Sequence, residues 1–267
     1  MLGCGGLLPE GELALIWEHP VRLDERGERG LGAVVAADGS AWSSSGQTCT
    51  EQTCEAPEPL AIWWDEGQLL VGTSAGLYRD GALIVAEPEA LAWAGQGSQW
   101  VCAVPGQILD HLGGSVPYSG RVVDLDLEDG RWLALLCDEQ CLVLDAQGEL
   151  ARAGERGRVD LFEGRACWSD PQDQERGLIE CEDGLSVQGL EGERLGAALD
   201  EGWAAGQLSV QVVPNRLRLV PLDGGTVLSL DRYRPGMPPS LAVGPAELVL
   251  GLPWGWDEGR VLVADRP

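Results

Sequence analysis

Lysine is missing from this chain of 267 residues: all 18 basic residues are arginines, against 43 acidic residues, for a formal net charge of −25. The absence of lysine excludes Schiff-base chemistry and a lysine general base. The excess of negative charge excludes nucleic acid as a partner, because phosphate contacts need a basic surface. We therefore expect partners that are proteins, or ligands that are neutral or cationic.

Long apolar runs and histidines are also scarce. No uninterrupted apolar stretch approaches 18 residues, so we expect no membrane-spanning helix. The two histidines, His19 and His111, leave little for general base catalysis or for a structural zinc site. The sequence motifs of a serine nucleophile elbow, a zinc protease and a phosphate-binding loop do not occur. These absences favour a protein that is not an enzyme and leave the enzymatic alternative open.

Asparagine and phenylalanine each occur once, as Asn215 and Phe162. Like lysine, both are encoded by AT-rich codons, whereas Ala, Gly, Arg, Pro and Trp are plentiful. A GC-rich genome explains this bias, and so does adaptation to high salt, where acidic surfaces without lysine stay soluble. The two causes stay open at this point.

Six of the eight cysteines form three close pairs in the sequence: Cys49 with Cys54, Cys137 with Cys141, and Cys167 with Cys181. We expect a disulfide within each pair, which implies an oxidising compartment. Buried thiols or a metal site are the alternative reading. Because no Cys-x-x-Cys motif occurs, we expect no metal.

The two remaining cysteines are Cys4 and Cys102. The segment Met1–Gly6 places a small residue before Cys4 and resembles the end of a bacterial lipobox, in which the cysteine is lipidated. This resemblance predicts lipidation of Cys4, a lipid anchor as the only contact with a membrane, and a tether over residues 1–11. Cys102 is then free. If Met1 is the true start and the resemblance is accidental, Cys4 is not lipidated and a Cys4–Cys102 disulfide becomes possible.

Short apolar runs of four to seven residues recur along the chain, separated by Gly, Asp-Gly, Glu-Gly or Pro. This pattern is typical of β-strands joined by tight turns. The runs also repeat as units of three or four strands, and the clearest units are Leu60–Val85, Val122–Asp145, Ala197–Val220 and Ser240–Val263. The sequence therefore predicts an all-β fold built from repeats.

A glycine marks the first turn of each unit: Gly39, Gly67, Gly97, Gly130, Gly164, Gly202 and Gly244. Spacings of 28 to 42 residues suit units of four short strands. We expect a single seven-bladed β-propeller of four antiparallel strands per blade over residues 12–267; a pair of β-sandwiches is the alternative. The isolated N-terminal strand Glu12–Glu18 would join the last unit, which has three clear strands, and so close the ring.

The last unit resembles the FG-GAP repeat of integrin-alpha-type propellers. The residues that carry the likeness are Ser240–Gly244, Glu247–Pro253 and Gly259–Asp265, and Leu69–Gly72 with Gly81–Val85 is a looser copy. The likeness covers two units well and the others in outline. Together with Cys4, it implies a propeller of the kind found in bacterial lipoproteins.

Many FG-GAP repeats bind Ca²⁺ in an Asp-x-Asp-x-Asp-Gly loop. The nearest match, Asp124–Gly130, has one residue too many before the glycine. We therefore expect Asp124 and Asp126 on the outer face of a strand, and no calcium or other cofactor. A weaker resemblance to the quinoprotein-type propeller repeat comes from Leu142–Leu150 and Ala37–Trp42, but no recurring docking motif supports a bound quinone.

Eleven tryptophans are an unusual surplus for this length. Most of them suit packing between blades. Trp254 and Trp256 lie in a turn between strands, and Trp63 with Trp64 places adjacent rings on opposite faces of one strand. Aromatic side chains on the loops of a rigid scaffold often contact ligands, so these four are the candidate binding residues. Packing is the alternative role for each of them.

These features predict a monomeric binding or scaffold module in the bacterial cell envelope or outside the cell. Its propeller loops would contact a protein or a neutral or cationic ligand. The alternative is an extracellular hydrolase or lyase that acts on glycan or peptide with carboxylates in the central channel. A channel lined by carboxylates, an arginine and a histidine would favour the enzyme.

Overall fold

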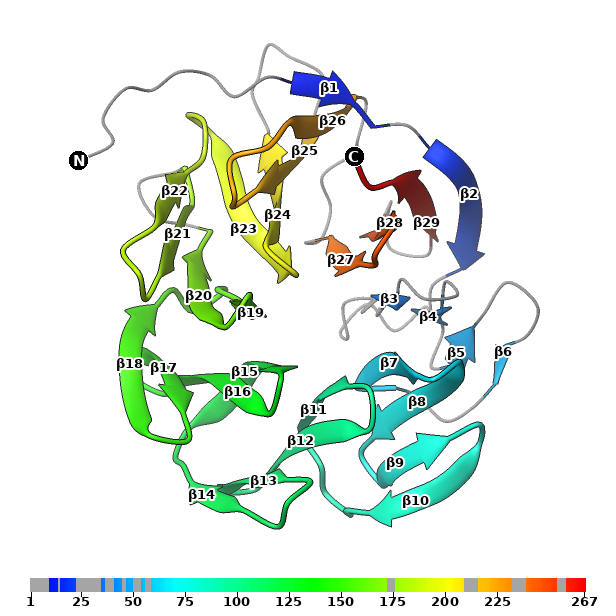
Figure 1. Cartoon of the computed structure of the whole chain (residues 1–267), viewed down its shortest axis with the longest axis vertical. Coiled ribbons are helices and arrows are strands. Elements are labelled where there is room, and N and C mark those ends of the chain that lie inside the picture. The colour runs from blue at the N-terminus through cyan, green and yellow to red at the C-terminus, as the bar shows by residue number, and fades with distance from the viewer. Residues whose placement is uncertain are drawn as a thin grey trace.

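The computed structural model describes residues 10–13, 15–22, 35–36, 41–44, 47–49, 54–55, 59–171, 176–208, 216–231, 239–253 and 258–267. Within these residues all regular secondary structure is β-strand, and the strands form separate sheets arranged around a central axis (Figure 1). The fold is therefore a single all-β propeller, as the repeats predict. In the described ranges, no helix is long and apolar enough to cross a membrane.

In four of the blades, four strands that are consecutive in the chain run from the central channel to the rim (Figure 1). The first of these blades contains β7 (Ala61–Asp65), β8 (Gln68–Thr73), β9 (Gly76–Arg79) and β10 (Ala82–Ala86). The second contains β11 (Ala92–Gln96), β12 (Gln99–Val104), β13 (Gln107–Asp110) and β14 (Ser115–Pro117). The third contains β15 (Arg121–Glu128), β16 (Arg131–Cys137), β17 (Cys141–Asp145) and β18 (Gly148–Ala153). The fourth contains β19 (Val159–Phe162), β20 (Arg165–Asp170), β21 (Leu178–Cys181) and β22 (Ser186–Gln188).

Two further blades take their outermost strand from the start of the chain. One contains β23 (Glu193–Asp200), β24 (Trp203–Leu208), β25 (Arg216–Pro221), β26 (Val227–Asp231) and β1 (Glu10–Glu12). The other contains β27 (Ser240–Val243), β28 (Glu247–Pro253), β29 (Glu258–Asp265) and β2 (Leu15–Arg22). Because β2 pairs antiparallel with β29, an N-terminal strand closes the ring as the sequence predicts. The closing strand begins at Leu15 instead of Glu12, and strand pairing begins already at Glu10.

The prediction of seven blades of four antiparallel strands is wrong in two respects. β1 pairs parallel with β26, so one blade has five strands. The structure also shows six blades instead of seven. The residues described between β2 and β7 form one further sheet of short strands, β3 (Val35–Ala36), β4 (Ala41–Ser44), β5 (Gln47–Cys49) and β6 (Cys54–Glu55). This sheet lies between β27 and β7.

Tryptophans pack between neighbouring blades, and two of them interlock the β7–β10 and β11–β14 blades. The indole N–H of Trp93 donates to the carbonyl oxygen of Thr73 at 2.8 Å, and Trp63 donates to that of Gly97 at 3.0 Å. The Trp63 ring lies so close to Gly95 that a Cβ there would come within 2.1 Å of it. The glycine is therefore required by the packing of the ring on the neighbouring strand.

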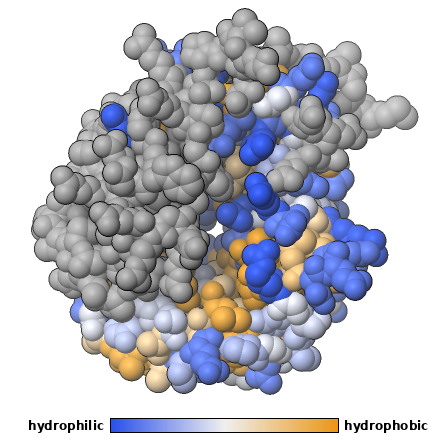
Figure 2. Space-filling view, turned by 180° about the vertical axis from the view of Figure 1, so that it is seen from behind, coloured by the Kyte–Doolittle hydropathy of each residue, from blue (hydrophilic) through white to orange (hydrophobic). Residues whose placement is uncertain are grey.

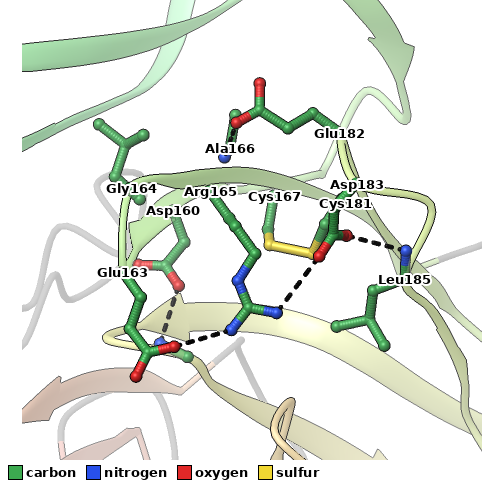
Figure 3. The surroundings of a disulfide bond; sticks show 12 residues. Asp160, Glu163, Gly164, Arg165, Ala166, Cys167, Cys181, Glu182, Asp183 and Leu185 are labelled. Carbon is green, nitrogen blue, oxygen red and sulfur yellow. Dashed lines mark hydrogen bonds and ion pairs between the residues drawn. A yellow bond between two sulfur atoms is a disulfide. The ribbon is translucent and has the colours of Figure 1, made fainter.

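Two of the three predicted disulfides are confirmed. Cys137 bonds to Cys141 between β16 and β17, and Cys167 bonds to Cys181 between β20 and β21 (Figure 3). Among the described residues, Cys102 is a free and buried thiol, and burial, with a smaller effect of the charge of Glu87, raises its pKa to about 12. Cys49 and Cys54 face each other in the register of β5 and β6. Their side chains, and Cys4, lie outside what the structure describes.

Candidate binding site at the central channel

Acidic residues gather at one end of the innermost strands because the same turn recurs there. In four blades the turn from the first to the second strand is an acid–glycine pair in which both residues have positive φ. These pairs are Glu66–Gly67, Asp129–Gly130, Glu163–Gly164 and Glu201–Gly202. Paired positive φ values are the signature of a type I′ hairpin turn, which favours glycine in its second position. The repeat thus places four acidic residues at the same end of the inner strands.

Alternating acids on β15 hold the neighbouring inner strand. The backbone N–H of Val159 donates to the carboxylate of Asp124 at 3.0 Å, and that of Leu161 donates to Asp126 at 2.6 Å. Because side chains alternate along a strand, both carboxylates lie on the same face, opposite to the buried Leu125. The alternation is the one predicted, but these acids bind the free edge of β19 instead of only facing water.

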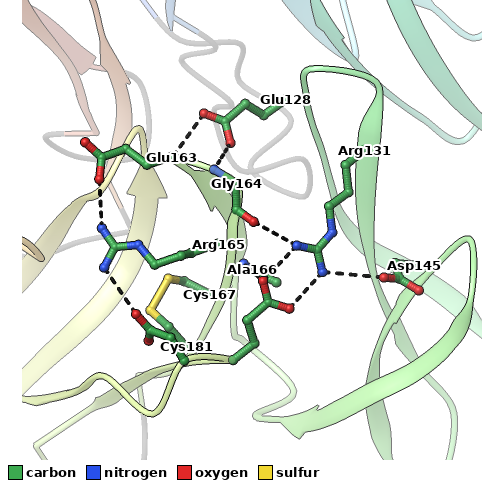
Figure 4. Close-up of polar contacts among 11 residues, drawn as sticks. Glu128, Arg131, Asp145, Glu163, Gly164, Arg165, Ala166, Cys167 and Cys181 are labelled. Atoms are coloured by element: carbon green, nitrogen blue, oxygen red, sulfur yellow. Dashed lines mark hydrogen bonds and ion pairs between the residues drawn. A yellow bond between two sulfur atoms is a disulfide. The ribbon is translucent and has the colours of Figure 1, made fainter.

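The same pattern continues at the turn. Glu128 accepts the N–H groups of Glu163 and Gly164 at 3.1 and 2.9 Å (Figure 4). Next to it, Arg131 donates to both carboxylate oxygens of Glu182 at 2.7 and 2.8 Å, and this pairing lowers the pKa of Glu182 to about 2. These contacts join the β15–β18 and β19–β22 blades.

Two further carboxylates repeat this arrangement between later blades. Asp160, which is 2% exposed, accepts the N–H groups of Glu201 and Gly202, each at 3.0 Å. Asp200 accepts the N–H of Val243 at 2.6 Å. An inner strand has an edge that faces the channel without a strand partner, and an unpaired buried N–H is costly. The aspartates satisfy these edge amides from the preceding blade.

Burial raises the pKa of each aspartate that accepts one of these edge amides. For Asp126 burial outweighs the hydrogen bond from Leu161 and, with the charges of Asp124 and Glu201, raises the pKa to about 7. The pKa of Asp160 and that of Asp200 lie well above the ordinary value, first because of burial and then because of neighbouring acids. Each of these aspartates therefore holds its proton to a higher pH than an isolated aspartate would.

A cavity of about 460 Å³ opens beside these aspartates, between blades on opposite sides of the axis. Trp63 and Trp64 of β7 form one wall, and Asp200, Glu201 and Arg266 contribute charged groups. The other lining residues are Ile62, Gly95, Gln96, Gly97, Ala242, Val243, Gly244 and Pro245. In the space-filling view a narrow opening remains near the centre, with both hydrophilic and hydrophobic residues on its coloured side (Figure 2).

The electrostatics of this cavity are mainly acidic. Asp200 uses one oxygen for the N–H of Val243, and the described part of the chain directs no hydrogen bond to its other oxygen or to the side chain of Glu201. Burial and the charge of Glu128 raise the pKa of Glu201, while Arg266 lowers it. Arg266 itself donates to the carbonyl oxygen of Gly244 at 3.1 Å. The cavity therefore offers carboxylate oxygens of Asp200 and Glu201 as hydrogen-bond acceptors beside tryptophan side chains.

The structure brings two of the four candidate tryptophans to this cavity. Trp63 is 7% exposed with its indole N–H satisfied, so it forms a fixed part of the wall. Trp64 is partly exposed, and its indole N–H is buried without a partner. Trp254 and Trp256 lie outside the described residues. In the described ranges, no group of three or more His, Cys, Asp or Glu is placed to hold a metal ion.

Sequence reasoning did not identify Asp160 and Asp200 as residues of this region. In a chain with 43 acids, neither stands out. A usable signal was their position: Asp160 lies four residues before a turn glycine, and Asp200 two residues before the next one. Aligning the repeats on these glycines would have placed acids at the same end of successive inner strands.

No protein-family model matches this sequence, and no curated protein matches it either. Solved structures do match its fold. A chain of BBS1N in complex with ARL6DN matches with a TM-score of 0.62 and 10% identity, covering 97% of this chain and 98% of that one. A chain of the mitotic checkpoint complex matches with a TM-score of 0.59 and 11% identity, covering 100% and 98%. The WD40 domain of Toxoplasma gondii coronin matches with a TM-score of 0.53 and 10% identity, covering 97% of this chain and 89% of that one.

These likenesses, at 10 to 11% identity over nearly whole chains, establish the fold alone. They support a β-propeller with WD40-type neighbours and do not show FG-GAP repeats or a bacterial lipoprotein, both of which stay predictions. By its fold, the chain is a β-propeller protein.

Proposed function

We propose that this protein is a non-enzymatic binding module that receives a segment of a protein, or a small cationic or neutral ligand, at the acidic mouth of its channel. The observation that carries this proposal is the cavity whose lining includes Trp63, Trp64, Asp200 and Glu201. An aromatic wall beside carboxylates favours a group with an apolar stem and a positive end, such as an arginine side chain. The propeller neighbours in protein complexes are consistent with a scaffold role.

Binding of short peptides tests this proposal. The probes are peptides that differ only at their central residue, which is arginine, serine or glutamate, and isothermal titration calorimetry reports their affinities. We expect the arginine peptide to bind best, and the Glu201→Gln variant to weaken it about tenfold, the size of one charge-assisted contact. Glu163→Gln is the matched control, because Glu163 occupies the same turn position in another blade and does not line the cavity. Equal binding of all three peptides would contradict the proposal.

An enzyme is the second candidate, and one observation favours it. Burial raises the pKa of Asp126 to about 7, which suits a general acid at neutral pH. Two observations count against the enzyme. One oxygen of Asp126 already accepts the N–H of Leu161. Neither histidine lies on an inner strand, since His19 belongs to β2 and His111 follows β13. Turnover of a pool of glycans and peptides that disappears in Asp126→Asn, with the fold intact, would decide for the enzyme.

We also infer that the protein works in the cell envelope or outside the cell, as a monomer that does not bind nucleic acid. Two disulfides support an oxidising compartment. Lipidation of Cys4 would add a membrane anchor. Mass spectrometry of the protein purified from its native host, beside Cys4→Ala, tests this point: a lipid-sized mass increase that the variant lacks supports the anchor, and an unmodified Cys4 rejects it.

A further inference from the structure

Among the described strands, the outermost strand of each sheet has one edge without a strand partner, and such an edge can pair with another chain unless it is protected. Most outer edges described here are protected. β14 and β22 have only three residues, and β14 ends in Pro117. β18 carries Glu149 and Arg152. The edge of β26 is covered by β1, which adds to it as a parallel strand.

β10 lacks these protections. Its five residues, Ala82–Ala86, are all apolar, and four of them are exposed. Leu83 is 50% exposed and Ile84 is 46% exposed, which is unusual for such large apolar side chains. In the space-filling view, apolar atoms reach the lower rim of the molecule (Figure 2). A strand of this length and composition at a sheet edge is suited to pairing with another strand.

A register shift in β10 presents its middle residue outward. Leu83 pairs with Tyr78 and Val85 pairs with Leu77, so Ile84 has no partner residue in β9. The peptide groups at this bulge are therefore released from the regular ladder with β9. Leu83 and Ile84 are both exposed as a result, on neighbouring positions of the edge.

Charges at both ends of β10 indicate which partner fits. Asp80 precedes the strand in an exposed turn, and Glu87 and Glu89 follow it. Arg79, the nearest basic side chain in β9, is held by Asp65 at 2.8 Å and does not offset these acids. The edge is thus an apolar strip between acidic ends, in a chain whose net charge is −25.

We propose that β10 is a docking edge that takes an extended segment of a partner protein, apolar at alternate positions and flanked by basic residues. The new strand would pair with the free backbone groups of β10, its apolar side chains would cover Leu83 and Ile84, and its basic ends would meet Asp80 and Glu89. The pairing of β1 with β26 shows that an outer edge of this propeller accommodates one more strand.

A second copy of this chain fits the edge poorly. Two β10 strands paired antiparallel would bring Asp80 of one copy near Glu87 and Glu89 of the other. Like charges at both ends, added to the repulsion between two chains of −25 each, oppose this pairing. A basic partner removes both penalties, which is why we assign the edge to it.

Three labelled peptides test the assignment by fluorescence anisotropy on the full chain. The first has alternating valine and threonine between pairs of arginines, the second replaces the arginines by glutamates, and the third keeps the arginines but has a central proline. We expect the first to bind at least about tenfold more tightly than either of the others, because only it can both form a strand and meet the acidic ends. Raising the salt concentration should weaken it.

Two variants locate the binding. Ile84→Pro removes a backbone donor from the edge, and the double variant Leu83→Ser with Ile84→Ser removes the apolar strip while keeping the backbone, in case the proline disturbs folding. Each should lower the affinity at least about tenfold. Leu112→Ser is the matched control, because Leu112 is 83% exposed in the turn after β13, away from β10.

Three results would overturn the proposal. Unchanged affinity in both β10 variants would place the peptide elsewhere. Equal binding of the proline peptide would mean that charge attraction alone holds it. A dimer that forms without peptide, as measured by sedimentation, and that disappears in the β10 variants would make a second copy the occupant.

Discussion

Asp160 of one inner strand accepts the backbone N–H of Gly202 at the turn of the next blade, at 3.0 Å, and is itself 2% exposed. Its other oxygen accepts the N–H of Glu201. One carboxylate thus satisfies both amides of a type I′ turn in the neighbouring blade. Glu128 accepts both amides of the Glu163–Gly164 turn in the same way. Asp126 and Asp200 each accept one amide of the next inner strand, so carboxylates connect neighbouring blades repeatedly.

Replacing Asp160 should destabilise the propeller. Asp160→Ala leaves the N–H groups of Glu201 and Gly202 without acceptors, and we expect the free energy of unfolding to fall by roughly 1 to 3 kcal/mol. Asp160→Asn should cost less, because its oxygen still accepts one of the two. Urea denaturation measures both. Glu149→Ala, an exposed acid on β18, is the control and should change little; an equal loss in the control would contradict a specific role for Asp160.

Stability should increase as the pH is lowered from about 8 towards 5. Asp126, Asp160 and Asp200 have pKa values raised by burial, so the folded protein binds their protons more tightly than the unfolded chain. Their stabilising contribution is fully present below the pKa of an unfolded aspartate and is lost as the pH rises through the folded value, about 7 for Asp126. Glu182 acts oppositely. Its lowered pKa means that the charged Glu182 stabilises the folded protein, and this contribution is lost only in stronger acid, as the pH falls towards about 2.

Urea denaturation over a pH series measures this dependence. Asp126→Asn should flatten the rise between pH 8 and 5, because its side chain does not titrate. Glu182→Gln should leave this range unchanged and alter only the acid limb. A free energy of unfolding that falls steadily from pH 8 to 5 in the wild type would show that these aspartates are charged in the folded protein without cost.

The two disulfides should differ in their contribution to stability. Cys167 and Cys181 are 14 residues apart, and Cys137 and Cys141 only 4. In the chain-entropy view the longer loop contributes about 3 kcal/mol and the shorter one about 2 kcal/mol. Pairwise replacement by serine, followed by chemical denaturation, measures both. Thiol counting on the unreduced, unfolded chain is the accompanying control; reactive thiols from these four cysteines would reject the bonds themselves.

Gly95→Ala should disturb the interface between the β7–β10 and β11–β14 blades. A Cβ at this position would come within 2.1 Å of the Trp63 ring, which must then move. We expect a loss of about 1 to 3 kcal/mol in the free energy of unfolding, from overpacking. Gly72→Ala, which would meet Trp93 in the same way, should behave alike. Near-UV circular dichroism reports the displaced indole, and an unchanged spectrum would contradict this packing.

Much of this fold is readable from the sequence because its determinants are local. Acid–glycine pairs such as Glu66–Gly67 specify type I′ turns, and the apolar alternation of Arg121–Glu128 specifies a strand with one buried face. Cys137 and Cys141 can pair because the turn between them is short. In contrast, the turn after β27 contains Gly244 without a positive φ, so a glycine alone did not define the turn type.

The sequence by itself determined the strands, the tight turns and the acidic character of this propeller, because each depends on residues close together in the chain. Only the tertiary structure decided that Asp160 holds the turn at Gly202, that Trp64 and Glu201 share a cavity, and that β1 covers β26 while β10 stays exposed. These relationships join residues 42 to more than 200 positions apart. They depend on how blades pack around the axis, which no local pattern encodes.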